Sequence, residues 1–204
     1  AGRGGKRARH RGEFERARGI MSPYEHSHYG PLLRDLGVAL CQIHDPGSAK
    51  YLEGIRLLER ACAASPRDPE ALAALGGAYL RMDRPGMALN CYRRALRIDD
   101  SYPYALSGLL ALELRDAPSS DLLAAYRPTL KLAAQRCREE IQASVRVPFA
   151  HLNLGKFLVL LGKTREGLGA YVDAIRAATA PFMFQTSIDS ISSLLEAKCI
   201  PVEL

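Results

Sequence analysis

The fold is decided by residues 68–103, which read DPEALAALGGAYLRMDRPGMALNCYRRALRIDDSYP. Apolar residues recur here at the three- and four-residue spacing of an amphipathic helix, first before and then after the turn at Asp83–Pro85. Pro69 and Pro85 open the two segments, and Pro is tolerated in a first helical turn because its missing N–H needs no partner there. The stretch therefore predicts two helices in one unit of about 34 residues.

A second stretch, Pro148–Pro181, repeats the same order of residues. The matching positions are Leu75, Gly76, Tyr79, Asp83, Ala88, Tyr92 and Ala95 in the first stretch and Leu154, Gly155, Leu158, Gly162, Gly167, Tyr171 and Ala174 in the second. This order resembles the tetratricopeptide repeat (TPR), whose pattern is W-x-x-L-G-x-x-Y followed by A-x-x-x-F and a later Ala and Pro. The resemblance covers Pro31–Pro181, with two clear units at about 69–102 and 148–181 and two degenerate ones.

The resemblance implies an all-α fold, an α-α superhelix or TPR-like solenoid of about four helix pairs with a C-terminal capping helix. The sequence pattern places helices at 31–43, 48–64, 69–82, 85–98, 103–115, 119–142, 149–161 and 164–178, and the cap at 182–198. Pro128 falls inside the sixth helix, where we expect either a kink or a division into a short and a longer helix. Gly76 lets the partner helix approach closely, and we expect Ala88 and Ala95 to face it.

The net charge of +6 is concentrated near the N-terminus. Residues 1–29 carry seven Lys or Arg and three Glu, a balance of +4, so residues 30–204 carry only +2. We expect residues 1–29 to be a disordered basic tail or lead-in and residues 30–204 to be the repeat domain. Nucleic acid could be bound only through this tail, and the alternative role for the tail is a solvated linker.

The cysteines indicate a reducing compartment. Cys41, Cys62, Cys91, Cys137 and Cys199 stand far apart and form no C-x-x-C pair, so we expect free thiols in a helical core and a cytoplasmic location. No apolar run approaches the ~18 residues that a membrane-spanning helix needs, so no membrane partner is expected. The chain does not begin with Met, which suggests a fragment of a longer protein or a processed form.

Nothing in the sequence indicates catalysis, so we expect no catalytic residue, metal ligand or cofactor. The phosphate-binding and nucleophile-elbow patterns G-x-x-x-x-G-K-[ST], G-x-G-x-x-G and G-x-S-x-G are missing. His26 and His28 lack an acidic or Cys partner at a ligand spacing. His44 lies in a turn that ends a helix, and His151 stands at the aromatic position of the repeat, where we expect a packed core residue.

The resemblance implies a concave groove lined by the first helix of each pair. The residues expected there are Arg34, Val38, Gln42, Glu70, Ala73, Gly77, Leu80, Arg81, Tyr104, Ser107, Ala111, Arg115, Phe149, Leu152 and Lys156. Small side chains among them leave room for a ligand backbone, and the four cations outnumber Glu70, which favours an acidic peptide or protein segment. Alternatively, Arg81 and Arg115 stabilise helix C-termini.

The resemblance thus implies a non-catalytic protein–protein interaction module that binds a partner peptide or helix in this groove. Two other functions stay open. The chain could be a regulatory or sensor domain of a larger enzyme or signalling protein, or a module tethered to nucleic acid by its basic tail.

Overall fold

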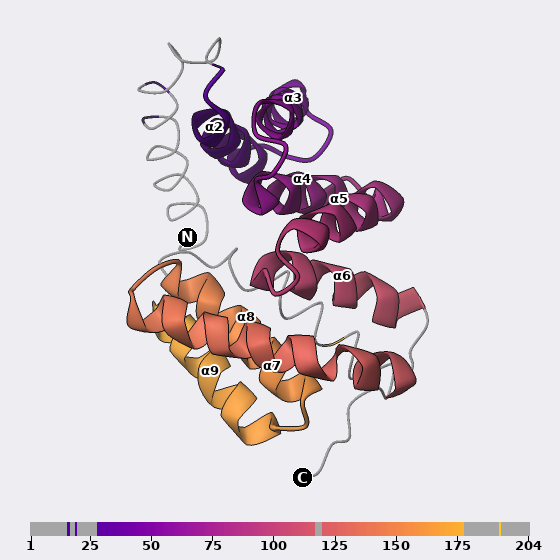
Figure 1. Cartoon of the computed structure of the whole chain (residues 1–204). Coiled ribbons are helices and arrows are strands. Elements are labelled where there is room, and N and C mark those ends of the chain that lie inside the picture. Colours follow the sequence, from indigo (N-terminus) through magenta and orange to yellow (C-terminus); the bar gives the residue numbers. More distant parts are fainter. Residues whose placement is uncertain (1–15, 17–18, 20–27, 117–119, 178–191, 193–204) are drawn as a thin grey trace. The chain divides into compact units, whose positions relative to one another are not determined.

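The computed structural model describes residues 16, 19, 28–116, 120–177 and 192. Within these residues the chain is all-helical, with eight helices, α2 to α9, and no strand (Figure 1). The all-α fold class is therefore confirmed. The chain divides into two compact units, residues 1–98 and 99–204, and each is described by itself. The expected cap at 182–198 and nearly all of the expected tail lie outside the described residues.

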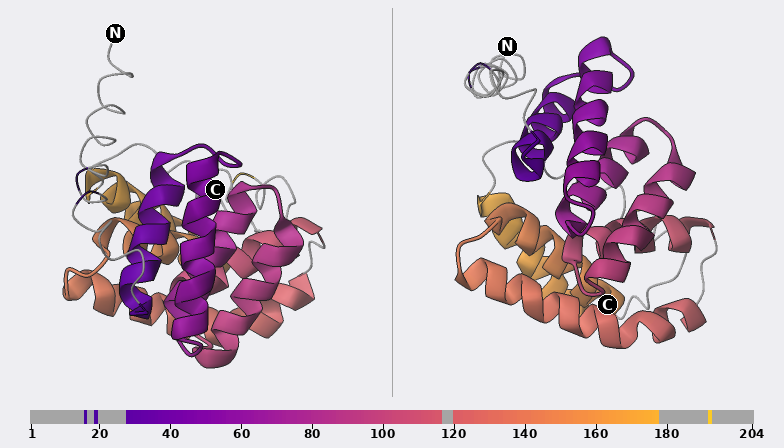
Figure 2. Two further views of the ribbon diagram at one scale, coloured as in Figure 1. Left: turned by 90° about the horizontal axis from the view of Figure 1, so that it is seen from above. Right: turned by 45° about the horizontal axis from the view of Figure 1, so that its top comes forward.

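Unit 1 consists of two stacked helix pairs. Its helices are α2 (Gly30–Ile43), α3 (Ala49–Ala64), α4 (Pro69–Arg81) and α5 (Pro85–Ile98). Helix α2 packs against α3 and α4 packs against α5, while α4 also contacts α2 and α3 of the preceding pair (Figure 2). The side-chain oxygens of Ser48 and Asp68 accept hydrogen bonds from the first N–H groups of α3 and α4 and fix where these helices begin.

Unit 2 also consists of helices that pack on their neighbours in the chain. Its helices are α6 (Pro103–Asp116), α7 (Ser120–Gln142), α8 (Val147–Leu160) and α9 (Thr164–Ala177). Helix α8 packs against α9 and against α7, and α6 contacts both α7 and α8. Helix α8 begins two residues earlier than the sequence predicts, with a proline in its first turn.

Helix α7 corrects one expectation, because it runs unbroken through Pro128. Of the two expected outcomes, the division into two helices is therefore wrong, and the kink stays a prediction. Proline has no N–H, so the carbonyl of Ala124 loses its partner within the helix. Both residues are exposed, and water can therefore satisfy that carbonyl.

Glycines set the closest helix crossings in both units. A Cβ added at Gly37 would lie 2.7 Å from a side-chain carbon of Leu58. A Cβ added at Gly76 would lie 2.7 Å from the Tyr92 ring, and one added at Gly155 would lie 2.8 Å from the Tyr171 ring. The first helices α2, α4 and α8 thus pack closely against Leu58, Tyr92 and Tyr171, respectively. The atoms nearest to a Cβ at Gly76 belong to Tyr92 and Cys91 on α5, and not to the expected Ala88 and Ala95.

Helices α4 and α8 end in the same C-terminal motif, with a residue of positive φ directly after the cap. That residue is Asp83 (φ 55°) after α4 and Gly162 (φ 82°) after α8. After α4, the backbone N–H of Arg84 donates to the carbonyl of Tyr79 (3.0 Å) and that of Asp83 to the carbonyl of Leu80 (3.0 Å). After α8, the N–H of Lys163 donates to the carbonyl of Leu158 (2.8 Å) and that of Gly162 to the carbonyl of Val159 (2.9 Å). This pair of bonds defines a Schellman motif.

Candidate functional site

The predicted groove residues lie on the first helix of each pair and fall into two sets. Unit 1 holds Arg34, Val38 and Gln42 on α2 and Glu70, Ala73, Gly77, Leu80 and Arg81 on α4. Unit 2 holds Tyr104, Ser107, Ala111 and Arg115 on α6 and Phe149, Leu152 and Lys156 on α8. The two sets belong to different units and are described separately.

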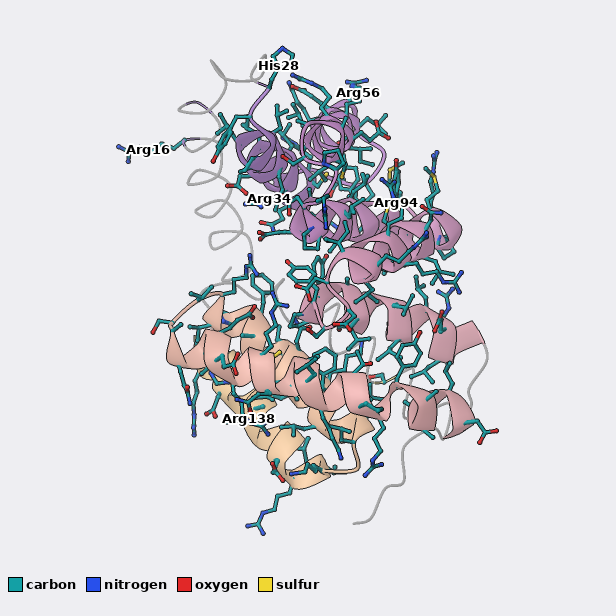
Figure 3. The ribbon with its side chains drawn as sticks, in the orientation of Figure 1. Arg16, His28, Arg34, Arg56, Arg94 and Arg138 are labelled. Carbon is teal, nitrogen blue, oxygen red and sulfur yellow. The ribbon has the colours of Figure 1, made fainter. Side chains whose placement is uncertain are left out.

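In unit 1, an ion-pair cluster joins the N-terminal ends of α2 and α4. The Nη1 atom of Arg34 lies 2.8 Å from Oε2 of Glu70 and 3.3 Å from Oδ2 of Asp68, and Nε lies 3.0 Å from Oδ1 of Asp35 (Figure 3). The Arg34 side chain is only 17% exposed. Burial lowers the pKa of Arg34, but the hydrogen bond with Asp35 and the three carboxylate charges outweigh it, so the pKa is raised. Arg34 therefore already has internal partners.

A second contact joins the C-terminal ends of the same two helices. Arg81, at the end of α4, donates from Nη1 to the carbonyl of Cys41 in the last turn of α2. Carbonyls in a last turn lack partners within their own helix, so this hydrogen bond satisfies one of them. Arg81 thus caps α2, rather than the helix to which it belongs. Since α2 and α4 are joined N-terminus to N-terminus and C-terminus to C-terminus, they lie parallel.

Val38 and Gln42 on α2 and Gly77 and Leu80 on α4 complete the predicted surface of unit 1 and are here called the first-helix face. Gln42 is exposed and the other three are half-buried. Ala73, which we expected on this surface, is buried in the interior. The face therefore offers the Gln42 amide and partly buried small or apolar groups to solvent, and the two neighbouring arginines, Arg34 and Arg81, are bonded within the unit.

In unit 2, the most exposed members of the predicted set are aromatic or charged. Tyr104 in the first turn of α6 is 42% exposed and Phe149 in the first turn of α8 is 41% exposed. Arg115 is exposed, while Ser107 and Ala111 are half-buried. Leu152 is buried, so it packs in the core and does not line a groove.

Lys156 also departs from expectation, because it is buried and only 4% exposed. Its Nζ donates a 2.7 Å hydrogen bond to the carbonyl of Ser107 on α6. Burial lowers the pKa of Lys156 to about 7. The expectation that Lys156 offers a positive charge to a ligand in the groove is wrong, because the amine lies in the interior between α6 and α8.

Two polar contacts around Tyr51 on α3 were not foreseen. Its hydroxyl donates a 2.8 Å hydrogen bond to the carbonyl of Ala78 on α4, and its ring lies under the guanidinium of Arg81. Arg81 and Tyr51 stand thirty positions apart, and no spacing pattern connects them. The last-turn position of Arg81, which favours a cation, is the one signal in the sequence.

The described residues contain no group of three or more His, Cys, Asp or Glu that could hold a metal ion. Cys41, Cys62, Cys91 and Cys137 are free and buried. Burial raises the thiol pKa of Cys41 to about 12 and that of Cys62 to about 11, and this makes both poor nucleophiles. His44 caps the C-terminus of α2 through its backbone N–H, and the enclosed Nδ1 of half-buried His151 has no hydrogen-bond partner among the described residues.

No protein-family model matches the chain, and a search of curated proteins finds no similar sequence. In the part of the chain that the structure describes, no helix is both long enough and apolar enough to cross a membrane.

Proposed function

We propose that the chain is a TPR-like, non-catalytic protein–protein interaction module that binds a peptide or helix of a partner on its first helices. The observation that carries the proposal is the pair of exposed aromatic side chains, Tyr104 and Phe149, in the first turns of α6 and α8. Aromatic side chains dominate the binding energy of protein interfaces, because they bury a large area at a small cost in conformational entropy.

The charges modify the kind of partner segment that we propose. An acidic segment was expected from four cations, but Arg34 is ion-paired, Lys156 is buried and Arg81 caps α2. We therefore assign most of the affinity to apolar and aromatic contacts. The exposed Arg115 contributes only to the orientation of the bound segment. Because its four described cysteines are free thiols, we also place the protein in a reducing compartment such as the cytoplasm.

The test begins with a partner, isolated with the tagged full chain and identified by mass spectrometry. The double substitution Tyr104→Ala and Phe149→Ala should weaken binding by about tenfold or more, since each truncation removes an anchor. Leu132→Ala on α7 is the matched control, because Leu132 is 54% exposed on a second helix and should leave the dissociation constant unchanged. A partner that binds the double variant as tightly as the wild type would place the binding site elsewhere.

A further inference from the structure

The outer side of unit 1 carries a concentration of arginines that the first-helix proposal does not use. Helix α5 exposes Arg93, Arg94 and Arg97, and the range Pro85–Ile98 contains no Asp or Glu. Helix α3 exposes Arg56 and Arg60 (Figure 3 labels Arg56 and Arg94). These five residues are called the arginine face.

The two helices that carry the arginine face both pack against α4. The charge of Arg94 on α5 lowers the thiol pKa of Cys62 on α3, and the charge of Glu59 on α3 raises that of Cys91 on α5, although burial is the larger cause in both thiols. The arginines of α3 and α5 therefore lie on two helices that share one neighbour, α4.

Acidic side chains near the arginine face have other partners. Glu59 accepts a 2.6 Å hydrogen bond from the hydroxyl of Tyr79, and Glu53 pairs with Lys50 at 2.7 Å. Within the described part of the chain, Arg56, Arg94 and Arg97 form no ion pair. The Tyr79 hydroxyl is neutral and leaves Glu59 charged, so the positive charge of Arg56, Arg94 and Arg97 exceeds the negative charge of the one carboxylate beside them.

The fold itself does not require these arginines, as the equivalent helix of unit 2 shows. The repeat register that aligns Gly76 with Gly155 aligns Arg94 with Asp173 and Arg97 with Arg176. On α9, Arg176 and Asp173 form an ion pair at 3.3 Å. The same structural position therefore carries a neutral pair in one unit and two cations in the other.

Exposed apolar side chains accompany the arginines. Leu52 on α3 and Met87 and Ile98 on α5 all expose more than a third of their surface. A mixture of Arg and Met with few Lys, Asp and Glu is the composition of protein–protein interfaces. The face has no exposed aromatic side chain on α3 or α5 on which nucleic-acid bases could stack.

We propose that the arginine face of unit 1 binds an acidic, amphipathic segment of a partner protein. Guanidinium groups form bidentate hydrogen bonds with carboxylates, and Leu52 and Met87 provide contacts for the apolar side chains of the segment. Because the charges are exposed, binding weakens as salt is raised. This site lies on second helices and is independent of the site proposed on Tyr104 and Phe149.

The test uses the full chain to select peptides from a displayed library of random short sequences. Selected peptides should carry an excess of Asp and Glu over the unselected library. Arg94→Asp combined with Arg56→Glu should weaken their binding by about tenfold or more at low salt. Arg94→Asp introduces the residue that α9 has at the equivalent position, Asp173. Because the fold accepts Asp there, circular dichroism should show an unchanged helix content. Arg176→Glu on α9 is the control and should leave binding within about twofold.

Three results would overturn the proposal. Selected peptides could lack an acidic excess, or acidic peptides could bind the double variant as tightly as the wild type. A short DNA duplex could also bind the arginine face more tightly than the best peptide, which would make the partner a nucleic acid. Peptides whose binding is lost only in the variant carrying Tyr104→Ala and Phe149→Ala report on the first-helix proposal, so the two proposals fail separately.

Discussion

The guanidinium carbon of Arg81 lies 5.3 Å from the centroid of the Tyr51 ring, and each residue bonds a carbonyl of a neighbouring helix. Arg81 donates to Cys41 on α2, and Tyr51 donates to Ala78 on α4. One cation–π contact therefore connects three helices of unit 1 at the point where two of them end. Polar groups, and not apolar packing alone, fix how the second pair stacks on the first.

Removing the Tyr51 hydroxyl should destabilise unit 1. Tyr51→Phe leaves the Ala78 carbonyl in a buried setting without its partner, and we expect a loss of about 1–2 kcal/mol in the free energy of unfolding. Tyr171→Phe is the matched control, because the enclosed Tyr171 hydroxyl has no hydrogen-bond partner in the described structure. Its removal should be neutral or stabilising. Urea unfolding of the two variants measures the difference, and equal losses would contradict this account.

The glycines at the helix crossings should not tolerate even a methyl group. Gly76→Ala places a Cβ 2.7 Å from the buried Tyr92 ring, so we expect it to destabilise the chain by about 1–3 kcal/mol. Gly169→Ala on α9 is the control, since a Cβ there has no neighbour within 4 Å. It should stabilise by about 0.5–1 kcal/mol through helix propensity. Thermal unfolding followed by circular dichroism gives both values, and a stabilised Gly76→Ala would contradict the crossing.

The Schellman motifs that end α4 and α8 predict opposite effects for substitutions at their residues of positive φ, Asp83 and Gly162. Asp83→Gly removes the steric cost of a left-handed backbone and should stabilise by up to about 1 kcal/mol. Gly162→Ala introduces that cost and should destabilise by about 1–2 kcal/mol. Chemical denaturation of both variants tests the pair, and a stabilised Gly162→Ala would show that the positive φ is not required there.

Much of the fold could be predicted from sequence because repeat spacing is local information. The spacing from Gly76 to Tyr92 recurs from Gly155 to Tyr171, and the structure brings both pairs into contact. The site was harder to predict, because exposure depends on the neighbouring pair. Lys156 stands at the same repeat position as Gly77, where unit 1 has no side chain, so the repeat gave no sign that the lysine is buried.

The buried amine of Lys156 makes stability depend on pH in a defined direction. Its pKa is about 7 in the folded chain, against about 10.4 when unfolded, so between these values the unfolded state binds more protons. Stability contributed by this group therefore rises with pH from about 7 towards 10, by about 1 kcal/mol per pH unit at the steepest. Buried thiols act oppositely above about pH 8.5, because their pKa values are raised on folding. The wild type and Lys156→Met contain the same thiols, so the thiol contribution cancels in the difference between their unfolding free energies. That difference should favour the variant most near pH 7 and shrink as the pH rises to 9, and parallel pH profiles would show that Lys156 is not buried as a neutral amine.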